Sequence, residues 1–251
     1  MLRMLSLVTL AAAVLANPAA GADLKVTSAG AVRGLMARII DDYSRQTAQK
    51  FEFTVGTTGQ LRAIIGSGFP ADLIITSAPL MGELEKTGNI TSRTDLGRVG
   101  LGIAVRDGTG MPNVTAADGF KKALLDAPRI ADVDPNSGPV YGSHLRGVYQ
   151  NLGIADVVLK KSIMQIGGKE VAEAVANGAA DIGVAFISEI IPIKGAKLAG
   201  PFPPALQGYT VYAAAIPKAS TDPTAARAFI DALVSPAMAR RWTEAGFEAP
   251  R

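Results

Sequence analysis

The sequence contains no cysteine, so disulfide bonds, thiolate metal ligands and cysteine nucleophiles are all excluded. It has a single histidine, His144, and no acidic triplet at ligand spacing accompanies it. We therefore expect no protein-bound metal and no other cofactor. A serine hydrolase is disfavoured as well, because no Gly-x-Ser-x-Gly turn is present to hold a nucleophile.

The sequence also lacks a strong charge imbalance and a long apolar run. Its formal net charge is +3 at pH 7, and basic residues do not cluster with aromatic ones, so no nucleic-acid partner is expected. The apolar run from about Met4 to Ala16 is shorter than the ~20 residues that span a bilayer. It follows Arg3 and precedes the small residues Ala20 to Ala22, the pattern of a cleavable secretory signal peptide over residues 1–22. We expect a periplasmic product with no stable membrane insertion after cleavage; an uncleaved anchor is the less favoured alternative.

The segment from Gly56 to Gly88 indicates how the chain is organised. Just upstream, Phe51 to Val55 have the aromatic and β-branched composition of a buried strand, and a Gly-Thr-Thr-Gly loop follows. Pro70 lies where the next helical segment ends, Ala71 to Ser77 form a second predicted strand, and Pro79 begins another helix. This alternation predicts an α/β fold that binds its ligand beyond the carboxyl ends of the strands.

Two loops at predicted strand ends place short side chains beside the start of a helix. Thr57 and Thr58 lie in one loop, and Ser28 and Ala31 border the other, which follows the predicted strand Leu24 to Gly30. The first turn of a helix has unpaired backbone amides and the positive end of the helix dipole, so it attracts anions. A threonine pair before a helix is explained equally well as a simple helix cap, and that alternative stays open.

Arg33 and Arg62 lie within about a turn of the start of the helices that follow these two loops. A guanidinium there can hold a carboxylate at two points, although a solvated surface arginine is the alternative for each. A third loop, Pro135 to Tyr141, is rich in turn-forming residues and precedes a predicted helix from Gly142 to Leu152. Ligand contacts are expected from this loop and the helix start, at Ser137, Tyr141 and His144.

The lone histidine has two interpretations. A single histidine is more often a structural residue than a functional one, but at a helix start facing a cleft His144 can donate to a carboxylate or exchange a proton near neutral pH. A glycine pair further along, Gly167 and Gly168, can let a ligand approach the backbone closely. An ordinary strand-to-helix turn explains that pair equally well.

The segment Pro70 to Ala78 (PADLIITSA), and the chain after residue 22 as a whole, resembles the periplasmic molybdate-binding protein family of ABC-transporter receptors. The resemblance implies a two-lobed type 2 periplasmic binding fold, each lobe a mixed sheet flanked by helices, with two crossing segments. Lobe I is expected over residues 23–104 and 212–251, and lobe II over residues 105–211.

The resemblance also implies which residues contact the ligand. The family's first-loop serine matches Ala31, its second-loop serine matches Thr58, and its tyrosine after a later strand matches Phe186. A fourth ligand loop falls at Gly168. Two of the family's ligand hydroxyls are therefore missing from this chain.

These departures favour an organic polycarboxylate over molybdate, because Arg33, Arg62, His144 and Arg146 add charged or basic side chains near the loops. We expect a periplasmic solute-binding protein that captures a small anion between its lobes for an ABC permease. Periplasmic aconitate isomerases resemble the same receptors. An enzyme that interconverts trans- and cis-aconitate is therefore the alternative, with His144 as its candidate catalytic base.

Overall fold

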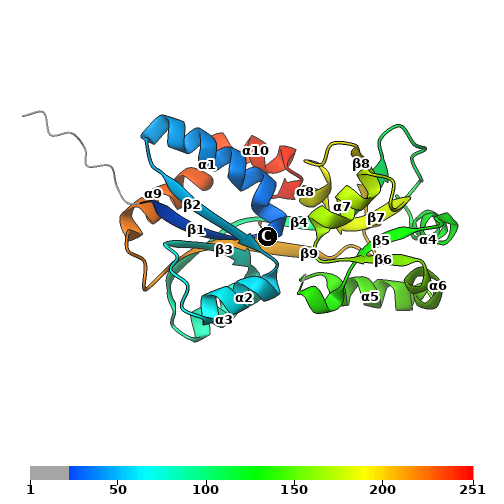
Figure 1. Cartoon of the computed structure of the whole chain (residues 1–251), viewed down its shortest axis with the longest axis horizontal. Helices are drawn as coiled ribbons and strands as arrows, with labels where there is room; N and C mark the ends of the chain where they lie inside the picture. Colours follow the sequence, from blue (N-terminus) through cyan, green and yellow to red (C-terminus); the bar gives the residue numbers. More distant parts are fainter. Residues whose placement is uncertain (1–22, 139, 251) are drawn as a thin grey trace, which may run out of the picture.

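The computed structural model describes residues 23–138 and 140–250, so the predicted signal peptide over residues 1–22 lies outside the described part. Two lobes lie side by side along the long axis of the molecule, each with a sheet and flanking helices (Figure 1). None of the helices in these two ranges has the length and apolar character needed to cross a membrane.

Lobe I is built on a mixed sheet with the strand order β2-β1-β3-β9-β4. Strand β1 (Leu24–Ala29) runs parallel to β2 (Phe51–Gly56) and β3 (Leu73–Ser77), while β9 (Tyr209–Pro217) is antiparallel to β3 and β4 (Ile90–Arg106). Strand β3 is buried along its whole length, which accounts for its almost continuous apolar run. The helical segments of this lobe are η1 (Gly30–Val32), α1 (Arg33–Thr47), α2 (Thr58–Gly66), α3 (Ala78–Lys86), α9 (Pro223–Leu233), η3 (Pro236–Met238) and α10 (Ala239–Glu244), and a short strand, β10 (Phe247–Glu248), pairs with β4.

Lobe II has a smaller sheet in which β7 (Ile182–Phe186) lies between β4 and β5 (Ile130–Val133). Strand β6 (Ser162–Gln165) pairs with β5, and β8 (Ala196–Pro201) pairs with β4. The helical segments are α4 (Ala117–Asp126), η2 (Pro135–Ser137), α5 (Gly142–Asn151), α6 (Ala155–Lys160), α7 (Gly168–Ala176) and α8 (Ile187–Ile190). The two-lobed mixed α/β architecture predicted from the sequence is confirmed.

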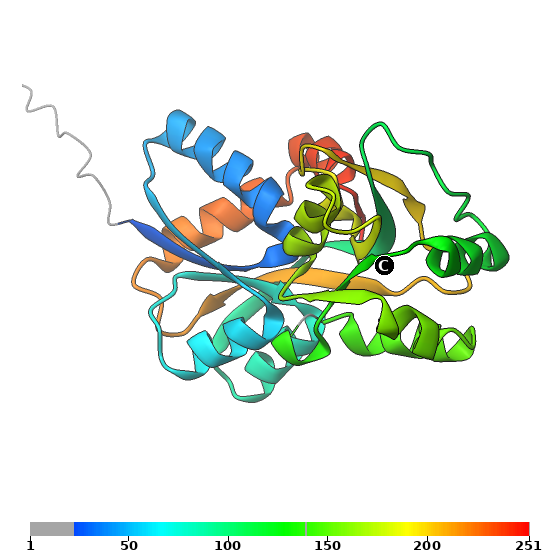
Figure 2. The ribbon, with the colours of Figure 1, turned by 45° about the vertical axis from the view of Figure 1, so that its right-hand side comes forward.

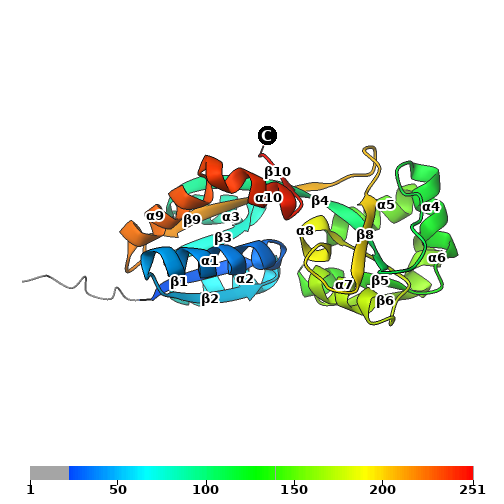
Figure 3. The ribbon, with the colours of Figure 1, turned by 90° about the horizontal axis from the view of Figure 1, so that it is seen from above.

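Two segments cross between the lobes (Figure 3). Strand β4 pairs with β9 as far as Gly100 and with β7 from Leu101 onward, so one strand belongs to both sheets. Just ahead of β9, the Gln207 side chain accepts a hydrogen bond from the Leu101 amide at 2.7 Å and donates one to the Leu101 carbonyl at 3.0 Å. These bonds tie the two crossing segments together. The predicted lobe boundaries after residues 104 and 211 lie within β4 and β9 and stay predictions.

The crossing segments bring several helix starts together at the boundary between the lobes. Figure 2 shows the blue helix α1 of lobe I beginning next to the yellow-green helix α7 of lobe II. Helix α2 also begins there, because Gly59 in its first turn is in contact with Gly138 of lobe II. The positive ends of three helix dipoles therefore point toward one region.

Candidate functional site

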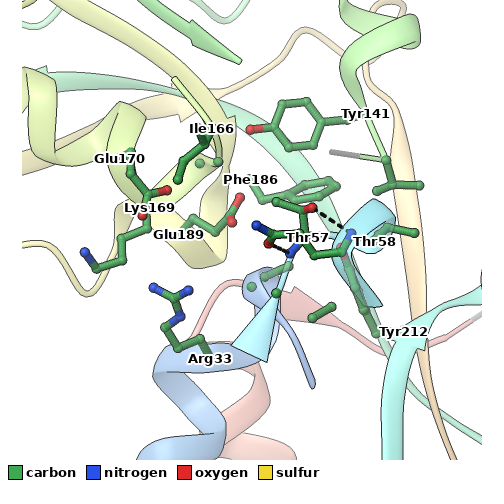
Figure 4. Close-up of a pocket in the computed structure, with 18 residues that line it drawn as sticks. Arg33, Thr57, Thr58, Tyr141, Ile166, Lys169, Glu170, Phe186, Glu189 and Tyr212 are labelled. Carbon is green, nitrogen blue, oxygen red and sulfur yellow. Dashed lines mark hydrogen bonds between the residues drawn. The ribbon is translucent and has the colours of Figure 1, made fainter. Parts of the chain in front are cut away.

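A cavity of about 70 Å³ lies between the lobes where α1, α2 and α7 begin (Figure 4). Lobe I forms its walls with the loops after β1 and β2, and lobe II with the residues before α5, around the start of α7 and after β7. This is the arrangement expected of a ligand site at the carboxyl ends of strands in an open α/β sheet.

Most of the site residues predicted from the sequence line this cavity. They are Ala31, Arg33, Thr57, Thr58, Tyr141, Gly168 and Phe186. The three loops of the prediction thus converge on one space, together with the glycine pair before α7. Their contact with a ligand stays a prediction.

Ser28 and Arg62 do not line the cavity. Ser28 is fully buried within β1, and its hydroxyl donates to the neighbouring Ala29 carbonyl at 3.3 Å. Arg62 is the fifth residue of α2, one turn beyond the cavity, and its guanidinium donates to both carboxylate oxygens of Glu83 at 2.9 and 2.7 Å. For Arg62, the alternative of a solvated surface arginine describes what the structure shows.

Ser137 and His144 are also directed elsewhere. The single O–H of Ser137 is shared between two carbonyls of lobe II, those of Asp134 at 2.7 Å and Ile166 at 2.9 Å. The Nε2 atom of His144 lies 3.0 Å from the Leu206 carbonyl, in the segment that leads back to lobe I. His144 thus packs against a crossing segment and has no place on the cavity wall.

Arg146, which the sequence places near the predicted ligand loops, is bonded inside lobe II instead. Its guanidinium donates to Asp132 Oδ2 at 2.8 Å and to the Val133 carbonyl at 3.1 Å. The Asp132 side chain is completely buried, and burial raises the pKa of this carboxyl although the charge of Arg146 lowers it in part. Arg146 is therefore a structural counter-charge.

Thr57 caps a helix, the simpler of the two roles that the sequence left open, and it also joins the two lobes. It caps α2, accepting a hydrogen bond from the Gln60 amide at 3.3 Å, while the Gln60 side chain accepts one from the Thr57 amide at 2.8 Å. The Thr57 hydroxyl also donates to the Ser137 carbonyl of lobe II at 2.9 Å. A helix cap of lobe I is therefore bonded directly to the other lobe.

A second contact between the lobes lies beside this bond. The Gly59 amide donates to the Gly138 carbonyl at 3.2 Å, and a Cβ atom added to Gly138 would stand 2.8 Å from the Gly59 Cα. Only glycine fits at this approach. We call Thr57, Gly59, Ser137 and Gly138 the cross-lobe latch.

Replacing Gly138 with alanine is expected to shift the lobes apart. The added methyl group collides with the backbone of Gly59, and φ of Gly138 is 88°, which costs a non-glycine residue about 1–2 kcal/mol. Gly153 is the matched control, because its φ is 65° and no atom lies within 4 Å of an added Cβ. Both variants should lose similar stability, but only Gly138→Ala should increase the radius of gyration in small-angle X-ray scattering. Identical scattering from the two variants would argue against the latch.

The carboxylate of Glu189 is the main site feature that the sequence analysis missed. It lies half-buried at the cavity wall, close to α7, and its Oε2 atom is fully buried and makes no well-aligned hydrogen bond in the described part of the chain. Burial raises its pKa to about 7, and the charge of Glu170 adds to this rise. The backbone amides of Phe186 and Gly168 and the charge of Arg33 lower it in part. This carboxyl therefore changes its charge near neutral pH.

Gly168 creates the space that Glu189 occupies. A Cβ atom added to Gly168 would lie 2.6 Å from the Glu189 Cδ and 3.1 Å from the Ala185 Cβ. The sequence suggested that this glycine lets a ligand approach the backbone. In the structure, it lets a buried carboxylate approach the first turn of α7.

Two tyrosines complete the wall. Tyr141 and Tyr212 are buried, and desolvation raises the pKa of both phenols well above its ordinary value, with the charge of Glu189 adding to the rise. Both are therefore neutral. The Tyr141 hydroxyl has no partner among the described residues, and its ring packs edge-on against Phe186 at 4.5 Å. Tyr141 thus provides a phenol beside the position where Phe186 lacks one.

Arg33 is the cationic side chain of the wall that is best placed to meet an anion. Figure 4 shows its guanidinium and the Glu189 carboxylate turned toward the same space. Lys169 also lines the cavity, but its ammonium group donates to Glu173 at 2.6 Å. Within residues 23–138 and 140–250, no hydrogen bond or ion pair holds the Arg33 side chain. The same residues contain no cluster of acidic residues and histidine with the arrangement of a metal site.

Comparisons with known proteins agree with this architecture. A family model described as bacterial extracellular solute-binding protein matches residues 24–248. An aconitate isomerase from a Pseudomonas species is 28% identical over 232 residues, which are 90% of this chain and 87% of the relative.

Two solved structures show the same fold. The periplasmic molybdate-binding protein of Azotobacter vinelandii has a TM-score of 0.76 at 23% identity, over 91% of this chain and 100% of that chain. The PEB3 protein of Campylobacter jejuni, solved with L-phospholactate bound, has a TM-score of 0.69 at 14% identity, again over 91% of this chain and 100% of that chain.

Proposed function

The chain belongs to the bacterial extracellular solute-binding protein family, and on that premise we propose that it captures a small organic acid anion between its two lobes. The ligand is a carboxylate, with polycarboxylates favoured over molybdate, and the protein works in the periplasm with an ABC permease as its partner. The observation that carries this proposal is the Arg33 guanidinium, which faces the cavity among the starts of three helices.

The donors around the cavity suit a carboxylate. A guanidinium binds the two oxygens of a planar carboxylate through parallel hydrogen bonds, which makes Arg33 a selective partner rather than a simple positive charge. The Tyr141 phenol supplies a neutral donor for a further carboxylate, and the positive ends of the three helix dipoles favour its negative charge. Glu189 adds a carboxyl group that can donate a hydrogen bond only when it is protonated.

The size of the cavity requires lobe movement for larger ligands. A dry cavity of about 150 Å³ accommodates benzene, so the present cavity of about 70 Å³ takes only a small anion as it stands. A tricarboxylate enters if the lobes separate at the latch and close again around it. Such hinge closure favours the form of the protein that binds the ligand better.

A calorimetric ligand series tests the proposal. The chain without residues 1–22 is titrated with malonate, citrate, trans-aconitate, molybdate and tungstate under the same conditions. We expect at least one of the carboxylates to bind with a stoichiometry of one molecule per chain. Both metal oxyanions should bind at least about tenfold more weakly, a difference in binding free energy of about 1.4 kcal/mol. Submicromolar molybdate binding with no carboxylate binding would reject the proposal.

An isomerase acting on aconitate is the second candidate. The aconitate isomerase relative favours it, as does an acidic group in the cavity with a pKa of about 7, close to the working pH of a general acid–base catalyst. In this candidate, Glu189 takes the place of His144 as the base. A carboxylate there removes one proton from a carbon next to the double bond of trans-aconitate, and the protonated group returns one proton at the far end of the allylic system. No oxidant or second substrate is needed.

Mixing the protein with trans-aconitate and following the cis isomer separates the two candidates. Loss of turnover in Glu189→Gln with turnover kept in His144→Ala would assign the base to Glu189. The reverse pattern would return that role to His144. If neither wild type nor variants form the cis isomer, the binding protein remains.

A further inference from the structure

The surroundings of Glu189 contain charges of both signs, contributed by several elements. Helix α1 contributes Arg33, helix α7 contributes Lys169 and Glu170, and the backbone amides of Phe186 and Gly168 lie against the carboxylate. The residue before α5 and strand β9 contribute the neutral phenols of Tyr141 and Tyr212. Arg33 is thus the cationic partner that an ionised Glu189 and an anionic ligand would share.

A bound carboxylate changes the balance at Glu189. Burial removes the solvent that would screen two negative charges from one another, so an ionised Glu189 repels an anion placed beside it. The ligand also competes for Arg33, which is one of the groups that favours the ionised form of Glu189. Both effects favour the protonated carboxyl once the cavity is filled.

A protonated Glu189 gains a partner that it lacks in the empty cavity. Its Oε2 atom is buried and makes no well-aligned hydrogen bond in the described residues, although the Phe186 and Gly168 amides lie near the carboxylate. Leaving such an atom unpaired costs free energy, and a ligand oxygen that accepts a hydrogen bond from the carboxyl removes that cost. The cavity wall therefore contains a carboxyl group that becomes a hydrogen-bond donor only when it is protonated.

We propose that Glu189 takes up one proton when the cavity captures a carboxylate, and that its hydroxyl then donates a hydrogen bond to the ligand. This inference rests on the proposed function and adds that ligand binding is coupled to the uptake of a proton. Glu189 thus contacts the ligand, and its ionisation as the pH rises weakens the binding of fully ionised ligands.

The direction of the pH dependence follows from the charge of Glu189. In the free protein the pKa of Glu189 is about 7, and a bound anion raises it further. The ligand therefore binds the protonated form better, so affinity is greatest below pH 7 and falls as the pH rises above 7. The loss approaches tenfold for each pH unit until the pKa of the complex is reached.

Calorimetry with trans-aconitate tests the coupling. Titrations at pH 6 and pH 8 in buffers of different ionisation enthalpy give both the affinity and the number of protons taken up. For the wild-type protein we expect affinity to fall about tenfold between these two pH values, and uptake of close to one proton per ligand at pH 8.

Two variants separate Glu189 from other groups. The Glu189→Gln variant should bind trans-aconitate with nearly the same affinity at pH 6 and pH 8 and without this proton uptake. Titration of the ligand's own carboxyl groups is common to both proteins and cancels in the comparison. Glu170→Gln should keep a pH dependence, displaced to lower pH, because the charge of Glu170 raises the pKa of Glu189.

The possible outcomes are distinct. Binding by the wild-type protein without proton uptake at pH 8, or the same pH dependence in Glu189→Gln, would overturn this inference and leave the proposed function intact. Failure of every carboxylate to bind at any pH would overturn both.

Discussion

Replacing Arg33 with methionine is expected to weaken carboxylate binding about 100-fold. Methionine keeps much of the length of the side chain but removes the guanidinium. In the wild-type protein the Arg33 side chain faces the cavity, and no described residue holds it by a hydrogen bond or ion pair. A hydrogen bond to a charged group contributes about 1.5–3 kcal/mol, and the upper end of that range corresponds to about two powers of ten in affinity. Calorimetry with the tightest carboxylate of the ligand series measures the effect.

Arg62→Met is the matched control for this change. Arg62 also lies near the start of a helix after a predicted ligand loop, but it pairs with Glu83 on the surface. Its removal should leave binding unchanged and alter stability by no more than about 1 kcal/mol. Equal losses of affinity in the two variants would show that Arg33 acts only through the general field of the protein.

Replacing Arg146 with methionine is expected to have the largest effect on stability. It leaves the Asp132 carboxylate, with a side chain that is 0% exposed, without its counter-charge. Breaking a buried pair from one side costs about 3–5 kcal/mol, and urea unfolding at pH 7.5 should show a loss of that size. The exposed pair of Arg129 and Asp181 provides the control, since Arg129→Met should cost no more than about 1 kcal/mol.

The loss in Arg146→Met should shrink as the pH is lowered. Burial already raises the pKa of Asp132 above its ordinary value, and removal of Arg146 raises it further. A carboxyl with a raised pKa in the folded state binds protons more readily there than in the unfolded chain, so folding is favoured as the pH falls. The difference in unfolding free energy between variant and wild type should therefore be smaller at pH 5 than at pH 7.5. A difference independent of pH would contradict the assignment of the lost stability to an uncompensated charge.

The fold was largely predictable because its signals are local. Apolar runs such as Leu73–Ser77 and the helix start at Pro79 identify strands and helices without knowledge of the rest of the chain. The helix Ala155–Lys160 and the strand Ala196–Pro201 were not predicted. The helix is only six residues long, and Gly200 and Pro201 interrupt the apolar pattern of the strand, so neither segment has a strong local signal.

The site was predictable only in part, because a loop can be located from the sequence more readily than the direction of a side chain. Arg33 is the first residue of α1 and faces the cavity, whereas Arg62 is the fifth residue of α2 and lies one turn away. His144 follows the third loop as predicted, yet its ring lies against the Leu206 carbonyl. A shift of two or three residues along a helix changes the face on which a side chain lies.

Glu189 illustrates a different limit. The sequence offers one signal for it, a lone acidic residue in the apolar run from Val184 to Ile191. Its pKa depends on Glu170, a residue from another helix of the same lobe, and on Arg33 of lobe I, which meets it only when the lobes come together. Sequence patterns cannot anticipate a property that arises from contacts between distant segments.

A crystal structure of the chain with its tightest-binding carboxylate tests the central claim most directly. We expect the ligand between the lobes, with one carboxylate within hydrogen-bonding distance of the Arg33 guanidinium and another oxygen facing Glu189. A ligand bound outside this cavity, or inside it without contact to Arg33, would contradict the account.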